Sequence, residues 1–162
     1  MSVAASDIKF YLSGGTNNTD PNASLGGTRS NTEVGSNLFD NITAGEAAGA
    51  ATADYRAISI KNNHGTDTLY SAKIWSSVQT KSNTAYFKYA LDGGVQTIAA
   101  DTDTPNDPAL TYTETISEST ALSLGDIGPG LAKRVWVKRV IPGNGMVSGS
   151  DTETITVKGQ TS

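Results

Sequence analysis

The chain contains no cysteine and only one histidine, and these two absences remove several kinds of site. Without cysteine, neither disulfides nor thiolate-bound metals can stabilise the fold. His64 lies in the turn sequence Asn62-Asn63-His64-Gly65, and a catalytic triad would need this one side chain to meet both an acid and a nucleophile. We therefore expect His64 to be a turn residue. We predict that the protein is not an enzyme and that it has no catalytic residue, bound metal or cofactor.

Charged and hydrophobic residues are also scarce. Charged residues make up 17% of the 162 positions, hydrophobic residues make up 36%, and the formal net charge is −4. A protein that binds nucleic acid through its phosphates needs a basic excess, so we expect no nucleic-acid partner. No apolar run is long enough to span a membrane, and residues 1–7 lack the basic flank and apolar core of a signal peptide. We expect no membrane contact and synthesis in the cytoplasm.

Glycine, serine, threonine, asparagine and aspartate are abundant, which favours short strands joined by turns. In the first fifty residues, a strand is predicted at residues 8–12 and is followed by many turn signals. Leu25 is the only apolar anchor among them. The pairs Gly14-Gly15 and Gly26-Gly27 lack the pattern of a phosphate-binding loop, so we interpret them as hinges. The sequence thus predicts an extended, Gly-rich N-terminal arm over residues 1–50, lying against its own domain or a neighbour.

One short helical turn is predicted within this arm, at residues 43–49. Thr43 and Glu46 have the spacing of a capping box, in which a hydroxyl and a carboxylate satisfy the free amides at a helix start. Ala47 and Ala48 favour the turn, and Gly49 is expected to end it. No longer helix is expected elsewhere.

From residue 51 onward the sequence predicts a β-sandwich domain that continues to residue 162. Ile58 and Ile60 alternate with Ala57 and Ser59, as in a strand with one buried face. Residues 95–99 are expected to pair back on the preceding strand through the turn Asp92-Gly93-Gly94. Further strands are predicted at residues 69–78, 85–91, 112–116, 121–124, 131–140 and 154–157. Strands at this spacing with almost no helix indicate an all-β sandwich of the immunoglobulin-like or jelly-roll type.

Two groups of residues could bind a ligand. Asp101, Asp103 and Asp107 could offer oxygen atoms to calcium, but Pro105 stands where a ligand belongs, which favours a solvated loop over an ion site. Trp75 and Trp136 could stack on sugar rings or contact a partner. Both lie in predicted strands, which favours a place in the core.

The strongest basic concentration lies in the predicted strand 131–140. Lys133 and Arg139 would point to one face of this strand, and Arg134 and Lys138 to the other. Charge on both faces is typical of an edge strand that is protected against aggregation. The alternative is contact with an acidic neighbour, and the sequence leaves both open with a preference for the edge strand.

Two resemblances follow from short motifs. Residues 55–62, Asp67-Thr68-Leu69 and Lys73-Ile74-Trp75 resemble the opening strands of an immunoglobulin-like sandwich, and residues 124–130 with Val135-Trp136-Val137 resemble its turn and late strand. A wider pattern is similar to small virion structural proteins of tailed bacteriophages. Its motifs are Leu12-Ser13-Gly14-Gly15, Ser24-Leu25-Gly26-Gly27, Asn37-Leu38-Phe39-Asp40, Tyr55-Arg56 and Trp136-Val137-Lys138-Arg139-Val140-Ile141-Pro142. This resemblance implies a structural protein without an active site.

The resulting expectation is a capsid decoration, or cement, protein on the capsid surface of the virion. It would bind the major capsid protein, self-associate as a dimer or trimer, and stabilise the shell because it binds only the assembled lattice. A neck, tail or baseplate protein is the first alternative, and a carbohydrate-binding module is the second. The candidate interface consists of apolar residues of the arm and basic residues of the late strand: Phe10, Tyr11, Leu12, Leu25, Leu38, Phe39, Arg134, Lys138 and Arg139.

Overall fold

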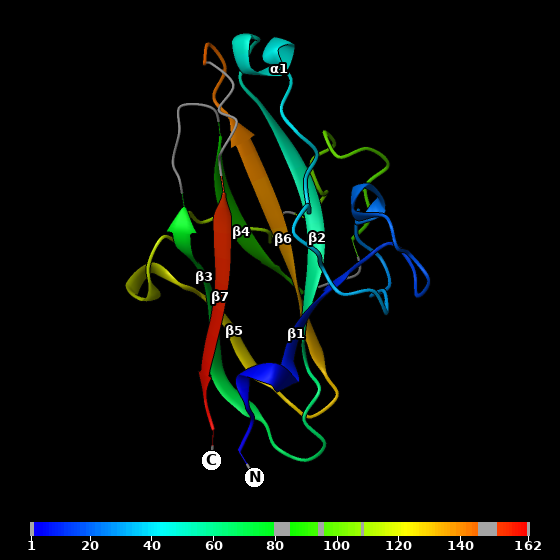
Figure 1. Ribbon diagram of the computed structural model, residues 1–162, viewed down its shortest axis with the longest axis vertical. Helices are drawn as coiled ribbons and strands as arrows, with labels where there is room; N and C mark the ends of the chain where they lie inside the picture. Colours follow the sequence, from blue (N-terminus) through cyan, green and yellow to red (C-terminus); the bar gives the residue numbers. More distant parts are fainter. Residues whose placement is uncertain (1, 80–84, 94–95, 108, 146–151, 162) are drawn as a thin grey trace.

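The computed structural model describes residues 2–79, 85–93, 96–107, 109–145 and 152–161, and within them it is a sandwich of two antiparallel sheets (Figure 1). The four-stranded sheet has the order β1 (Ile8–Leu12), β2 (Thr52–Asn62), β6 (Ala132–Ile141), β4 (Tyr86–Asp92). The three-stranded sheet has the order β5 (Leu122–Ile127), β3 (Leu69–Gln79), β7 (Glu153–Gln160). The predicted all-β sandwich class is confirmed.

Helical structure is limited to short pieces. The 3₁₀ turns η1, η2 and η3 cover Ala5–Asp7, Pro21–Ala23 and Glu118–Thr120, and the helix α1 covers Ala44–Ala48. The predicted capping box is confirmed: the Thr43 hydroxyl accepts from the Glu46 amide at 3.2 Å, and the Glu46 carboxylate accepts from the Thr43 amide at 2.7 Å. Across the described residues, no helix has the length and apolar character needed to cross a membrane.

Strand alternation gives the four-stranded sheet two buried faces. Ile58 and Ile60 of β2 belong to the core between the sheets, together with Val135 and Val137 of β6. The opposite, outer face carries a smaller core in which Tyr55, Ala57 and Trp136 are buried. Partly buried Ile98, Leu110 and Tyr112 pack against this second core, so loop residues cover the outer face. The sheet is therefore buried on both sides near its centre.

The N-terminal segment is part of the sandwich. β1 pairs with β2 from Ile8 opposite Asn62 to Leu12 opposite Ile58. The other edge of β1 bonds to the chain around Thr32, whose carbonyl accepts from the Leu12 amide at 3.0 Å. Leu12 is 1% exposed. β1 and the chain around Thr32 thus lie against the sandwich, as part of its larger sheet.

Two glycines that the sequence suggested as hinges are closely packed instead. Gly14 and Gly26 have φ values of +90° and +94°, in the left-handed region. A Cβ atom on Gly14 would overlap the Ala23 carbonyl, and one on Gly26 would overlap the Gln96 carbonyl. These positions allow backbones to approach closely, and they fix the segment on the sheet.

The predicted strand at residues 95–99 is not a ladder partner of β4. Residues 94 and 95 lie outside the described residues, and among residues 96–99 only Thr97 forms a bridge, to Gly26. β4 pairs with β6 along one edge, and Thr113 bonds to Tyr89 on the other. With both edges of β4 engaged, the chain after it crosses to the outer core, where Ile98 packs.

Candidate functional site

Several residues of the predicted interface are buried and cannot contact a partner directly. Leu12 and Arg139 are 1% and 5% exposed, so their assignment to a surface was wrong. Phe10, Leu38 and Phe39 are partly buried and pack against the core between the sheets, and Leu25 is half-buried. The reason is that the N-terminal segment closes its own sandwich and so buries the apolar residues it carries.

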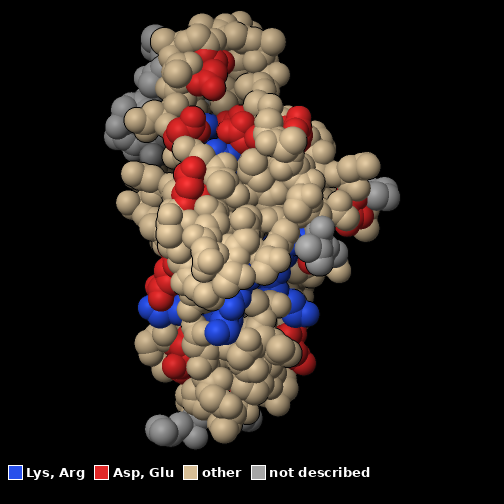
Figure 2. Space-filling view, turned by 90° about the vertical axis from the view of Figure 1, so that its right-hand side faces the viewer, with Lys and Arg blue, Asp and Glu red and all other residues tan. Residues whose placement is uncertain are grey.

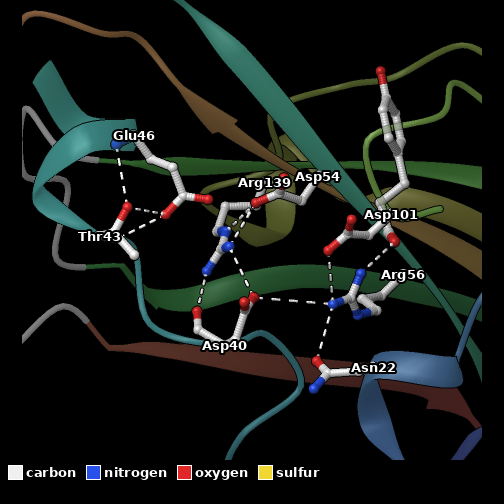
Figure 3. Close-up of polar contacts among 9 residues, drawn as sticks. Asn22, Asp40, Thr43, Glu46, Asp54, Arg56, Asp101 and Arg139 are labelled. Carbon is white, nitrogen blue, oxygen red and sulfur yellow. Dashed lines mark hydrogen bonds and ion pairs between the residues drawn. The ribbon is translucent and has the colours of Figure 1, made fainter. Parts of the chain in front are cut away.

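Arg139 is one of two buried arginines at the α1 end of the sandwich (Figure 3). Its Nε and a terminal nitrogen donate to Asp54 Oδ2 at 2.9 and 2.5 Å, across the β2–β6 ladder in which the two residues are paired. It also donates to the Asp40 carbonyl at 2.5 Å and lies 3.3 Å from the Asp40 carboxylate. Burial raises the pKa of Asp54, and Arg139 opposes that rise by bonding to the ionised carboxylate.

Arg56 is the second buried arginine, at 1% exposure. One of its terminal nitrogens lies 3.1 Å from both Asp101 Oδ2 and Asn22 Oδ1, and 4.0 Å from the Asp40 carboxylate. The Phe39 ring stacks against the guanidinium groups of Arg56 and Arg139, at 5.3 and 4.8 Å from its centroid. We call these two arginines with Asp40, Asp54 and Asp101 the arginine clamp.

The arginine clamp joins segments that are distant in the sequence. Asn22 in η2, Asp40 and Asp101 come from three different connections between strands, and all three meet guanidinium groups of β2 and β6 (Figure 3). Charge-assisted bonds of this kind are stronger than neutral ones, and a buried guanidinium without partners would be costly. The clamp therefore fixes loops that would otherwise be among the more mobile parts of the chain.

The same loops complete the edge of β2 beyond the end of β1. The last β1 pair is Leu12 with Ile58, and the next two outward-pointing β2 amides have loop partners. The Ala57 amide donates to the Ser24 carbonyl, and the Tyr55 amide to the Asp101 carbonyl, both at 2.8 Å. The edge is thus satisfied without a continuous strand.

The basic strand β6 is a central strand, so its interpretation as a protected edge was wrong. Its two arginines form ion pairs within the protein. Arg134 forms an ion pair with Asp92 and donates to the Gly27 carbonyl at 2.6 Å. The indole Nε1 of Trp136 donates to the same Asp92 at 2.9 Å. Arg134 thus ties the Gly-rich segment to the sheet.

Lys138 lies on the outer face among aromatic rings. Its Nζ is 5.5 Å from the ring centroids of both Tyr55 and Tyr112, within the range of cation–π attraction. Burial raises the pKa of Tyr112, so this phenol stays neutral. Lys138 is half-buried and directly opposite Lys88 in the ladder.

Trp75 and Trp136 are 8% and 0% exposed, so neither indole can stack on a sugar ring without rearrangement. The expectation that both lie in the core is confirmed.

The other sequence-predicted candidates have local structural roles. Asp101 is part of the clamp, Asp103 accepts from the Ala100 amide, and Asp107 accepts from the Ala109 amide. His64 Nδ1 accepts from two turn amides. Across the part of the chain that the structure describes, no group of three or more His, Cys, Asp or Glu side chains is placed to hold a metal ion.

A basic surface lies over β1 and β2. Lys9 and Lys61 are directly opposite each other in the ladder, so both side chains point to the same, outer face. Tyr11 of β1 is half-buried on the same face, with Arg29 at 4.9 Å and Lys61 at 6.0 Å from its ring centroid. We call Lys9, Tyr11, Arg29 and Lys61 the basic belt. Figure 2 shows Lys and Arg side chains gathered in a band on this side, with some Asp and Glu side chains directly beside the band and several more nearer the α1 end.

Among the described residues of the basic belt, Lys9 forms an ion pair with a carboxylate. Its Nζ lies 3.3 Å from Glu33, in a pair where the two side chains are 41% and 54% exposed. Exposed pairs of this type contribute little and are screened by salt. The Arg29 guanidinium donates to the Ser30 carbonyl at 2.8 Å, which holds it in place over the Tyr11 ring.

Comparison with family models, curated proteins and solved structures gave no match for this chain.

Sequence reasoning missed most of the belt. Tyr11 was among the predicted interface residues, and the alternation of side chains along a strand places Lys9 on the same face of β1 as Tyr11. The opposition of Lys9 and Lys61 depends on the β1–β2 register, which joins positions far apart in the chain.

Proposed function

We propose that this protein is a structural protein of a tailed-bacteriophage virion, and that it acts as a decoration protein on the capsid. It would bind the major capsid protein on the capsid surface, in many copies, and self-associate as a dimer or trimer. Binding to the assembled lattice alone would stabilise that lattice by mass action. The similarity of its short motifs to small virion structural proteins supports this proposal.

The arginine clamp is the observation that carries the proposal. Arg56 and Arg139 hold three loops on a sandwich that is already buried on both faces of its larger sheet. A surface that is ordered before binding loses little conformational entropy when a partner docks. A protein that works by contact alone gains affinity from such rigidity, and the clamp supplies it without disulfides or metals.

Copy number is the decisive measurement. Quantitative mass spectrometry of purified particles should give a ratio to the major capsid protein near one, or a simple fraction of one. About a dozen copies per particle would instead place the protein in the neck, tail or baseplate. Absence from the particles would refute the virion proposal.

A second measurement tests stabilisation. Capsids with and without the protein should be heated or exposed to denaturant in parallel, and those that carry the protein should withstand the harsher condition. Equal stability would mean that the protein binds the shell without acting as cement.

A further inference from the structure

We propose that the basic belt is the docking surface of this protein, and that it binds an acidic patch on a folded partner protein. The inference rests on the proposed function, under which this partner is the capsid lattice. It narrows that function to a face of the sandwich and to the chemistry that the face recognises.

The first argument is the opposition of Lys9 and Lys61 across the β1–β2 ladder. Like charges directly opposite each other in a sheet lower stability, and opposite charges raise it. Lys9 is paired with the Glu33 carboxylate, whereas the Nζ atom of Lys61 lies over the neutral Tyr11 ring. An acidic partner would relieve this repulsion, so its binding to the belt should be more favourable in free energy than its binding to a neutral surface.

The second argument is the order of the belt before any partner binds. The Arg29 guanidinium is fixed by the Ser30 carbonyl and by the Tyr11 ring. The Tyr11 hydroxyl accepts from Asn63 Nδ2 at 3.1 Å. Tyrosine and arginine are enriched among the residues that dominate binding energy in protein interfaces. Here the two are stacked and held in one position, which reduces the entropy lost on docking.

The third argument concerns the size of the partner's charged region. A long polyanion such as DNA would extend past the band and meet the Asp and Glu side chains nearer the α1 end (Figure 2). The overall charge of −4 would also oppose it. A compact acidic patch on a protein surface can contact the band and avoid most of these side chains. Charge complementarity therefore favours a protein over a nucleic acid.

The test compares two variants of the full-length chain that each lose three positive charges. The belt variant carries Lys9→Gln, Arg29→Gln and Lys61→Gln, and it keeps Tyr11. The control variant carries substitutions away from the belt: Lys73→Gln, Lys88→Gln and Lys158→Gln. Binding to purified capsids that lack the protein is measured by co-sedimentation at low and at high salt.

We expect the belt variant to bind capsids about tenfold or more weakly than the wild type at low salt, because three complementary charges are removed at once. Its binding should also depend less on salt. The control variant should bind within about twofold of the wild type. Equal affinities of the belt and control variants would overturn the docking proposal and leave the proposed function intact. No binding by the wild type would instead refute the proposed function, and the docking proposal with it.

Two further readouts separate docking from other roles. The belt variant loses the exposed Lys9–Glu33 pair and the Arg29 contacts with Ser30 and Tyr11, and it also loses the Lys9–Lys61 repulsion. These small effects oppose one another, so it should unfold at a denaturant concentration close to that of the wild type. A clear loss of stability would show that the belt is a structural feature and would overturn the proposal. So would binding of the wild type to a DNA fragment that the belt variant does not bind, because the belt would then serve a nucleic acid.

Discussion

Arg139→Met should be strongly destabilising, and its effect should depend on pH. The change keeps a long apolar side chain against Phe39 but leaves the Asp54 carboxylate, 4% exposed, without its guanidinium partner. Breaking a buried ion pair from one side costs about 3–5 kcal/mol. For a chain of 162 residues this corresponds to a decrease in the melting temperature of roughly 6–20 °C.

The pH dependence follows from the direction of the Asp54 pKa shift. Burial raises its folded-state pKa above the value of 3.8 for a free side chain, so the folded state binds the proton more tightly than the unfolded state. Stability from this group is present at low pH and is lost as the pH rises through the folded pKa. Arg139→Met removes the bond that opposes the rise, so the folded-state pKa of Asp54 should be higher in the variant. The pH range over which stability is lost then extends to higher pH. The variant should therefore be most destabilised near neutral pH and partly recover on acidification.

A double-variant cycle checks this reasoning. Guanidinium unfolding curves are recorded for the wild type, Arg139→Met, Asp54→Asn and the double variant at neutral and acidic pH. Because the double variant buries no unpaired charge, it should be more stable at neutral pH than Arg139→Met alone. A double variant whose loss equals the sum of the two single losses would refute the coupling. So would a loss in Arg139→Met that is the same at both pH values.

Three smaller perturbations test other parts of the structure. Leu12→Ala should lower the free energy of unfolding by about 2–5 kcal/mol, because Leu12 is in the core, and a loss below about 0.5 kcal/mol in chemical denaturation would contradict the placement of β1. Gly26→Ala should lower the melting temperature, because its Cβ would overlap the Gln96 carbonyl at a φ of +94°, and unchanged melting would show that the segment is not closely packed there. Thr43→Ala should cost about 0.5–2 kcal/mol. The Thr43 backbone amide and, to a smaller extent, its hydroxyl lower the pKa of Glu46, so the wild type should lose this stability as pH falls. The variant keeps the amide and loses the hydroxyl, so its pH dependence should be weaker but still present in melting curves recorded at several pH values.

Local patterns in the sequence predicted the elements well where one face of a strand is buried. The alternation around Ile58 and Ile60 correctly placed β2, and the spacing of Thr43 and Glu46 correctly placed α1. These signals are contained within a few residues, and they depend on the periods of strands and on the amides at a helix start.

Predictions failed where a residue's environment is set by partners far along the chain. Arg139 looked like a surface charge because its partner Asp54 is brought to it only by the β2–β6 register. Charge on both faces of β6 suggested an edge, but Asp92 pairs with Arg134 and Asp54 with Arg139, one on each face of a central strand. The buried role of Gly26 depends in the same way on the approach of Gln96. No pattern within one element contains this information.

The way in which loop carbonyls complete β2 has a consequence for the order of folding. The amides of Tyr55 and Ala57 are satisfied by Asp101 and Ser24, which come from opposite sides of β2 in the sequence. Closing a long loop costs entropy that contacts must repay. The β2–β6 pairing repays it with ten residue pairs, whereas each of these loop contacts yields one backbone bond, so β2 and β6 should pair first and this section of the edge should close late. In hydrogen exchange, the Tyr55 and Ala57 amides should then open together in a partial unfolding that leaves the rest of β2 protected. The molecule would thus contain a late-forming, cooperative unit made of loops instead of strands.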